Sequence, residues 1–254
     1  MSETKKIAVA GATGRVGRHV VDILTAAGHD VVAMSRAGGV DIVTGDGLAT
    51  ALEGVEVVID VASTPSPDEK EATAFFTTAA RNLQEAGYRA GVQRIVAVSI
   101  IGIEKFKSGY NVAKLAHERA LQEGPVPVQI LRAAQFHEFV EQMVQWGTQG
   151  DVAYVPRMRT QLVAARTVAQ TLVDLALAPA AGGIVDGPFP EIAGPRAEDL
   201  VEMAALLARR RGGPARVQGV GDLDDPDQVA YENGGLLPGP HATLGGPTFA
   251  EWLG

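Results

Sequence analysis

Residues Lys6–Val20 read KIAVAGATGRVGRHV and decide the fold. The apolar run Ile7–Ala10 predicts a buried strand, and the glycines after it predict a tight turn into a helix. Gly11 allows the turn, Gly14 lets the backbone approach a pyrophosphate, and Gly17 lets the helix pack closely on the strand. The positive end of the helix then faces the phosphates. This stretch therefore predicts a dinucleotide-binding site.

The composition is ordinary for a soluble globular protein, with 254 residues, 46% hydrophobic and 20% charged. We expect one domain, residues 1–254, with a C-terminal substrate-binding subregion at about 180–254. A net charge of −8 argues against a nucleic-acid partner, and no apolar run is long enough for a membrane span. The absence of cysteine excludes disulfides, thiol nucleophiles and Cys-ligated zinc. We expect a cytoplasmic monomer or homodimer that acts on a small molecule, with no metal site.

Apolar runs alternate with helical patterns along the chain. The expected strands are Asp30–Met34, Val40–Thr44, Val55–Val61, Arg94–Ser99, Val126–Arg132, Asp151–Pro156, Gln161–Ala165 and Val217–Val220. The expected helices are Val16–Ala27, Ala72–Ala86, Tyr110–Gln122, Glu138–Trp146, Arg166–Ala178, Arg196–Arg210 and Thr248–Leu253. Loop and strand are expected over 182–190, and loop over 221–246. Near-continuous apolar strands separated by helices predict an α/β fold with a doubly wound parallel sheet.

The residue after the second strand indicates which cofactor is bound. An acid there accepts from the ribose 2′-hydroxyl of NAD, whereas an arginine accommodates the 2′-phosphate of NADP. Arg36 follows this strand, and Arg15 in the glycine turn is a second candidate phosphate ligand, so we favour NADP. The alternative is two solvated arginines. Asp46, after the third predicted strand, either bonds the adenine amino group or caps the next helix.

Tyr110 and Lys114 are four residues apart on one face of a predicted helix. An ammonium near a phenol lowers the phenol pKa, and such a tyrosine can exchange a proton with a carbonyl or alcohol oxygen. Ser99 ends the preceding strand and could hold the same oxygen, while Lys114 could also bond the nicotinamide ribose. The alternative is that the two residues are an ordinary pair on the surface of the helix.

The motifs GATGRVG, Arg36, VIDVAS, RIVAVS and YNVAK, in this order, resemble a short-chain dehydrogenase/reductase of the atypical or extended type, similar to the NAD(P)H-binding, NmrA-like proteins of bacteria. The resemblance covers about Lys6–Leu177. It implies a Rossmann fold with a seven-stranded sheet and a small C-terminal lid. It also implies tyrosine as acid/base, lysine as its partner and serine as oxyanion holder. The family serine often stands one or two places later, where this chain has isoleucine.

The expected site has three parts. The catalytic residues are Tyr110, Lys114 and Ser99. The cofactor-binding residues are Gly11, Thr13, Gly14, Arg15, Val16, Gly17, Arg36, Asp46, Ala62, Ser63 and Lys114. The substrate-binding residues are Gln135, Phe136 and His137. A histidine titrates near neutrality, so His137 is either a pocket residue or a packed one. The histidines expected to be structural are His19, His29, His117 and His241.

The sequence therefore predicts an NADPH-dependent oxidoreductase that reduces a carbonyl or conjugated double bond, with Tyr110 as proton donor. Two alternatives stay open. One is a non-catalytic NADP(H) sensor that binds a regulatory protein, because the glycine turn serves a sensor equally well. The other is an epimerase or isomerase that retains its nicotinamide and returns the hydride.

Overall fold

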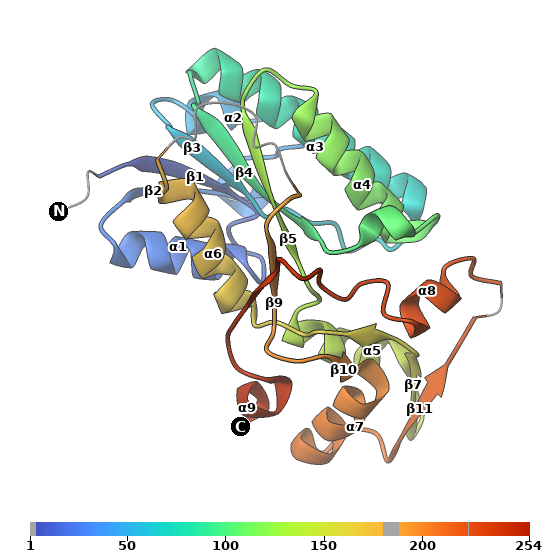
Figure 1. The fold of residues 1–254 in the computed structure, drawn as a ribbon. Helices are drawn as coiled ribbons and strands as arrows, with labels where there is room; N and C mark the ends of the chain where they lie inside the picture. Colours follow the sequence, from blue (N-terminus) through green and yellow to red (C-terminus); the bar gives the residue numbers. More distant parts are fainter. Residues whose placement is uncertain (1–3, 180–187, 223) are drawn as a thin grey trace. The chain divides into compact units, whose positions relative to one another are not determined.

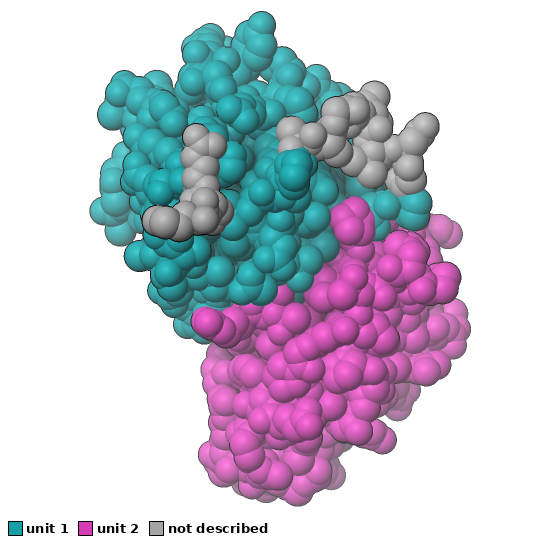
Figure 2. All heavy atoms as spheres, turned by 60° about the vertical axis from the view of Figure 1, so that its left-hand side comes forward, with its two compact units in different colours: residues 1–99, 109–131, 168–189 teal, residues 100–108, 132–167, 190–254 magenta. Residues whose placement is uncertain are grey.

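The chain forms two compact units, shown in teal and magenta in Figure 2. The computed structural model describes residues 4–179, 188–222 and 224–254. The first unit comprises residues 1–99, 109–131 and 168–189, and the second comprises residues 100–108, 132–167 and 190–254. The second unit thus draws on more of the chain than the predicted subregion at about 180–254. The predicted loop and strand over 182–190 lie mostly outside the described residues.

The central element is a seven-stranded parallel sheet (Figure 1). Its strands, in spatial order, are β12 (Thr243–Leu244), β9 (Glu191–Ala193), β5 (Val128–Ala133), β4 (Arg94–Ile100), β3 (Val57–Asp60), β1 (Lys6–Ala10) and β2 (Asp30–Met34). Because β1 lies between β2 and β3, the strand order reverses there. Ligands of doubly wound sheets bind outside the carboxyl ends of the strands at such a reversal. The predicted fold class is confirmed.

Helices cover both faces of the sheet within the first unit (Figure 1). One face carries α1 (Gly17–Ala26) and most of α6 (Ala165–Leu177). The other carries α3 (Glu69–Ala90) and α4 (Gly109–Gln122), which pack against each other. A short helix, α2 (Leu48–Ala51), contacts α3. The strands β1 and β3 between these layers are almost wholly buried, as expected for a parallel sheet covered on both sides.

The second unit contains two smaller sheets and four helices among its described residues. One sheet has the order β11 (Arg216–Val220), β7 (Val152–Pro156), β6 (Thr148–Gln149), and the other pairs β10 (Glu198–Asp199) with β8 (Arg159–Thr160). The helices are α5 (His137–Gly147), α7 (Leu200–Arg211), α8 (Gln228–Glu232) and α9 (Phe249–Leu253). Apolar side chains of these elements share one core, which includes Val140, Leu200 and Phe249.

The predicted third strand, Val40–Thr44, is wrong, because this segment forms turns. The Asp41 carboxylate accepts hydrogen bonds from the backbone N–H of Val43 at 2.8 Å and of Thr44 at 3.3 Å. A short acidic side chain that bonds its own backbone two residues on stabilises a turn and competes with strand pairing. Consequently β2 is the last strand at its edge of the sheet.

Two predictions in the second unit are also wrong. The segment Gln161–Ala165 is not a strand and makes a single bridge, between Phe136 and Val163. The predicted loop over 221–246 contains both α8 and β12. These two elements are only five and two residues long, so neither shows enough hydrophobic periodicity to be recognised from sequence.

Aspartate caps decide where two helices begin. The Asp68 carboxylate accepts from the Glu71 N–H at 2.9 Å, so α3 begins earlier than the predicted Ala72. Asp199 caps α7 in the same way, so this helix begins at Leu200 and not at Arg196. Among the described residues, no helix is both long and apolar enough to cross a bilayer.

Candidate functional site

The three glycines of the turn after β1 differ in their surroundings. Gly11 has φ +79°, and a Cβ there would lie 2.8 Å from the Ala62 backbone. A Cβ at Gly17, the first residue of α1, would clash with the Gly11 carbonyl. At Gly14 a Cβ would meet that same oxygen at 3.1 Å, and this residue is exposed. The first and third glycines therefore close the turn, whereas the second presents bare backbone to solvent.

The N-terminus of α1 lies directly behind this turn. No side chain caps the helix, and its first turn contains no acidic residue. Thr13 and Arg15 are exposed beside it, whereas the Val16 side chain is buried and has only its backbone to offer. An uncapped helix end with bare backbone in front of it is chemically suited to an anionic group such as a pyrophosphate.

The end of β3 connects the glycine turn to α4. Ala62 packs against Gly11, and the next residue, Ser63, is exposed. The Ser63 hydroxyl shares a 2.9 Å hydrogen bond with the hydroxyl of Tyr110, in the first turn of α4. The Tyr110 ring packs edge-on against Phe76 of α3, with ring centroids 5.6 Å apart. The structure thus brings together segments that are far apart in the sequence.

Burial raises the pKa of Tyr110, and the hydrogen bond to Ser63 opposes this rise. The sequence led us to expect the reverse, a phenol pKa lowered by Lys114. The difference arises because the Lys114 ammonium is engaged elsewhere, at the Val98 carbonyl, which accepts from it at 2.9 Å. In this geometry Tyr110 is a protonated phenol at neutral pH.

Lys114 belongs to a buried polar chain that sequence reasoning missed. Its ammonium lies 2.8 Å from Nδ1 of His117, and Nε2 of His117 lies 3.0 Å from Oδ2 of Asp60. All three residues are at most 4% exposed. Two signals were available in the sequence. Asp60 ends an otherwise apolar strand, and His117 follows the lysine by three residues on one helix face.

The pKa shifts of these three residues indicate which of them are charged. Burial lowers the pKa of Lys114 to about 8, although Asp60 and Glu118 act to raise it. Burial also lowers the pKa of His117, as does the charge of Lys114. For Asp60, burial raises the pKa, but the hydrogen bond from His117 and the charge of Lys114 are among the effects that outweigh it, and the pKa is lowered. At neutral pH the aspartate and lysine are therefore charged and the imidazole is neutral.

Ser99 lies near the carboxyl end of β4 and is 4% exposed. Within the described part of the chain its hydroxyl has no hydrogen-bond partner. A buried hydroxyl of this kind costs on the order of 1–3 kcal/mol. It is an exception to the rule that buried polar groups are paired.

The two arginines predicted to read the cofactor phosphate are both exposed. Arg36 follows β2 and opens the 3₁₀ helix η1 (Arg36–Gly38). Arg15 stands in the glycine turn after β1, and the two strands are paired in parallel, so both residues follow carboxyl ends at the same edge of the sheet. Arginine side chains at this edge are suited to bind the phosphate groups of a ligand.

Asp46 does not cap a helix, so one of its two predicted roles is wrong. The residue before α2 is Gly47, and no side chain caps that helix. The Asp46 carboxylate is exposed and accepts a hydrogen bond from the Thr44 hydroxyl at 2.8 Å. Its predicted bond to adenine stays a prediction.

The three predicted substrate residues belong to the second unit, around the start of α5. The Gln135 side-chain oxygen accepts from the Thr160 hydroxyl at 2.7 Å. Phe136 is the residue before α5, with extended backbone. His137 is fully buried. Gln135 and Phe136 are partly accessible, and their substrate contact stays a prediction.

His137 packs between aromatic rings of α9. Its centroid lies 5.5 Å from that of Phe249 and 5.3 Å from that of Trp252, and its Nε2 donates to the Pro247 carbonyl at 3.1 Å. Burial lowers the pKa of His137 to about 4, against the smaller opposing effect of the Pro247 hydrogen bond. Of the two alternatives for His137, the structure shows the packed one.

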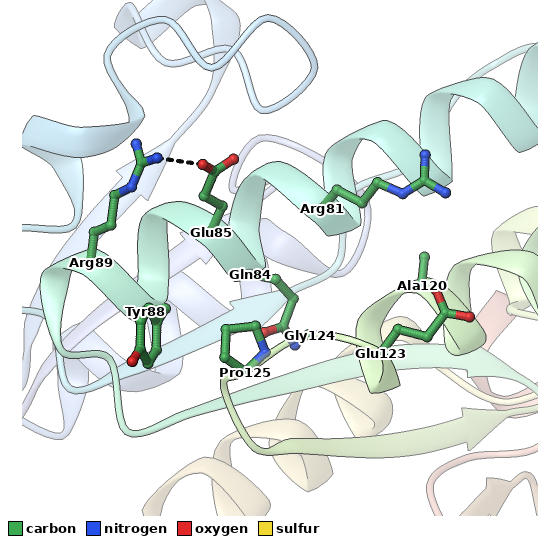
Figure 3. Close-up of a pocket in the computed structure, with 9 residues that line it drawn as sticks. All are labelled: Arg81, Gln84, Glu85, Tyr88, Arg89, Ala120, Glu123, Gly124 and Pro125. Carbon is green, nitrogen blue, oxygen red and sulfur yellow. Dashed lines mark hydrogen bonds and ion pairs between the residues drawn. The ribbon is translucent and has the colours of Figure 1, made fainter.

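A separate hollow of about 510 Å³ lies against α3 and α4 of the first unit (Figure 3). It is lined by the later turns of α3, which carry an ion pair between Arg89 and Glu85, by Ala120 of α4 and by the segment that follows α4. No predicted site residue lines it. Across the described residues, no group of three or more His, Asp or Glu side chains is placed to hold a metal ion.

Residues 11–179 match a family model described as NAD(P)H-binding. The chain belongs to this NAD(P)H-binding family. The matched range begins at the glycine turn and includes the segment with Tyr110 and Lys114. The predicted NAD(P)-binding domain is thereby confirmed. The choice between NAD and NADP is a separate question.

Dehydrogenases, reductases and epimerases are among the similar proteins. L-Arabinose 1-dehydrogenase (NAD(P)(+)) of Haloferax volcanii is 31% identical over 125 residues, which cover 46% of this chain and 48% of that protein. The chain thus spans about half the length of this curated relative. UDP-N-acetylglucosamine 4-epimerase from Bacillus cereus has TM-score 0.67 and 21% identity, covering 98% of this chain and 94% of the other. dTDP-4-dehydrorhamnose reductase from Bacillus anthracis, in complex with NADP, has TM-score 0.67 and 15% identity, covering 99% and 98%. The two structures share the fold.

Proposed function

We propose that this protein is an NADPH-dependent oxidoreductase that reduces a carbonyl or a conjugated double bond of a small organic substrate. One observation carries the proposal: the Tyr110 hydroxyl bonds Ser63, whose neighbour Ala62 packs against Gly11 of the glycine turn. A proton donor and a phosphate-binding turn thus meet at the reversal of strand order, where this fold binds ligands.

The residues of the first unit fit the cofactor. The exposed backbone at Gly14 and the uncapped end of α1 suit the pyrophosphate, and Arg36 suits a 2′-phosphate. Ala62 borders the turn on its β3 side, and Ser63 follows it in the sequence. When bound, a reduced nicotinamide supplies the hydride; the protein supplies binding, orientation and a proton.

Tyr110 would act as the general acid. Its raised pKa keeps the phenol protonated at neutral pH, which suits proton donation to the oxygen of a carbonyl undergoing reduction. Ser99 would hold that same oxygen, because its buried hydroxyl has no partner among the described residues. Lys114 would bond the nicotinamide ribose, the other role that the sequence offers for it, because its charge does not set the pKa of the Tyr110 phenol.

The test is a screen of carbonyl, enone and quinone compounds for loss of NADPH absorbance, followed by Tyr110→Phe. The substitution should lower turnover by roughly 10²–10⁴, the usual contribution of a positioned acid. NADPH affinity should change little. Tyr88→Phe is the matched control, because Tyr88 is 66% exposed and far along α3, and it should be silent. A Tyr110→Phe protein with the wild-type rate would contradict the proposal.

Two other results would favour a different function. A protein that binds NADPH but consumes none with any compound, and changes its affinity for a protein partner with redox state, would be a sensor. A protein that retains nicotinamide through purification and interconverts epimers without net oxidation would be an epimerase, as one of the structural neighbours is named.

A further inference from the structure

The buried chain formed by Asp60, His117 and Lys114 is not required by the proposed proton transfer from Tyr110. Asp60 at the end of β3 is hydrogen-bonded to His117 of α4 at 3.0 Å, and His117 is hydrogen-bonded at 2.8 Å to Lys114, which lies one turn earlier on the same helix. Burying three ionisable groups is costly unless each is paired. Here each group is hydrogen-bonded. The last group in the series is the Lys114 ammonium, which the proposed function uses.

We propose that Asp60 and His117 are positioning residues, which fix the place and the proton of the Lys114 ammonium. The inference rests on the use of the Lys114 ammonium in the proposed function. It assigns a functional role to His117, which was expected to be structural, and to Asp60, which ends an apolar strand.

With Asp60 and Lys114 charged and the imidazole neutral, the donors and acceptors allow one arrangement of the protons. The Asp60 Oδ1 accepts from the Ala62 N–H at 3.0 Å, and its Oδ2 faces Nε2 of His117. An ionised carboxylate can only accept, so Nε2 of His117 carries the proton. Nδ1 of the same neutral ring then presents a lone pair to Lys114, which can only donate while it is charged. Asp60 thus determines the tautomer that receives the ammonium.

The remaining surroundings favour a fixed ammonium. The Val98 carbonyl of β4 accepts a second hydrogen bond from Nζ at 2.9 Å, and the Phe76 ring of α3 lies 4.5 Å away, centroid to Nζ. Two acidic side chains contribute negative charge, Asp60 from β3 and Glu118 from α4. Two protons of the ammonium are therefore held in place, and the third is left for another acceptor.

Asp60→Asn is the most informative substitution, because it conserves the shape of the side chain and replaces one hydrogen-bond acceptor, Oδ2, by an NH₂ donor. The amide oxygen of Asn can still accept from Ala62, which turns its NH₂ toward Nε2 of His117. The ring must then accept there and carry its proton on Nδ1, which points a donor at Lys114. The ammonium loses an acceptor and a nearby negative charge. Its midpoint should fall by about one pH unit, the lower end of the effect of a neighbouring charge.

The first experiment needs no substrate. Long-range ¹H–¹⁵N NMR of the imidazoles gives the tautomer of His117, assigned with His117→Gln. Protonation at Nε2 with a bare Nδ1 is expected, and a proton on Nδ1 would overturn the proposal. A ¹⁵N-lysine titration then compares the midpoint of Lys114 between wild type and Asp60→Asn, and an unchanged midpoint would also overturn it.

A matched control separates this effect from loss of stability. Gln84 is likewise buried in the α3–α4 layer, where its amide donates to the Leu121 and Val126 carbonyls. Gln84→Met should lower the melting temperature and leave the Lys114 midpoint where it was. A midpoint that moves equally in both variants would mean that general loosening, and not Asp60, controls the lysine.

The pH profile of turnover is the final measurement. With a midpoint near 8 in wild type and near 7 in Asp60→Asn, the charged fraction of Lys114 at about pH 8 falls about fivefold, but at about pH 6 it hardly changes. Turnover should follow this pattern, whereas misfolding would lower it at every pH. If no compound is reduced, the proposed function fails, and the NMR titrations still decide the assignment of Asp60 and His117.

Discussion

Acidification should weaken the second unit through His137, and the effect can be sized from the structure. The folded pKa is about 4, against an ordinary value of 6.5. The folded state therefore binds fewer protons than the unfolded state between these values, so stability is full above pH 6.5 and is lost as the pH falls toward 4. A difference of about 2.5 units at 1.36 kcal/mol each gives about 3 kcal/mol, or about 2 kcal/mol after allowance for solvent screening.

The assay is urea unfolding followed by tryptophan fluorescence at several pH values. Both tryptophans, Trp146 and Trp252, belong to the second unit, so the signal reports on the part of the molecule that contains His137. His137→Phe keeps a ring between the aromatic residues of α9 but cannot be protonated. It loses the hydrogen bond to Pro247, worth about 1 kcal/mol at neutral pH.

The comparison between the two proteins is the decisive quantity. Carboxylates titrate in both, and burial raises the pKa of Glu198 in the same unit, so only the difference isolates the histidine. The gap between wild type and His137→Phe should narrow, and then reverse, as the pH falls from 6.5 to 4. Parallel curves over that range would refute the reasoning, because they would show that protonation of His137 costs the fold nothing.

Three further predictions concern the cofactor. NADPH should bind at least tenfold better than NADH, and Arg36→Ala should remove the preference, because a charge-assisted phosphate bond is worth about 1.5–3 kcal/mol; equal affinities in wild type would remove the argument for NADP. Gly14→Val should keep the fold by circular dichroism and lose NADPH binding by fluorescence titration, and normal binding would place the phosphates elsewhere. Gly17→Ala should instead lower the melting temperature, because its Cβ meets the Gly11 carbonyl.

The sequence was most informative where several rules gave the same answer. β2 spans the predicted Asp30–Met34, and α1 lies within the predicted helix, because hydrophobic pattern and glycine placement agree there. The prediction failed at Val40–Thr44, where a single side chain, Asp41, bonds the backbone and overrides an apolar pattern. Local side-chain chemistry of that kind leaves no periodic signal.

The candidate site shows the same division. The glycine turn could be recognised because its residues are consecutive. The partner of Tyr110 could not, because Ser63 is a contact across sequence distance and the helix pattern favoured Lys114 instead. His117 was overlooked for a similar reason, since only the fold shows that Asp60 lies opposite it. The sequence left open whether His137 is packed or lines a pocket, because burial, which sets its pKa, is a tertiary property.

The interleaving of the two units along the chain has a consequence for synthesis on the ribosome. The chain passes back and forth between them, so the first unit is complete only when residues 168–189 have emerged. Arg94 of β4 donates to the carbonyls of Ala176 and Ala178, which ties an early strand to the end of α6. At a synthesis rate of about 5–20 residues per second, one apolar face of the nascent sheet stays exposed for several seconds before α6 has been made. During that interval the emerging polypeptide is a client for chaperones that bind exposed strands, and any truncation that ends before α6 keeps it in that condition.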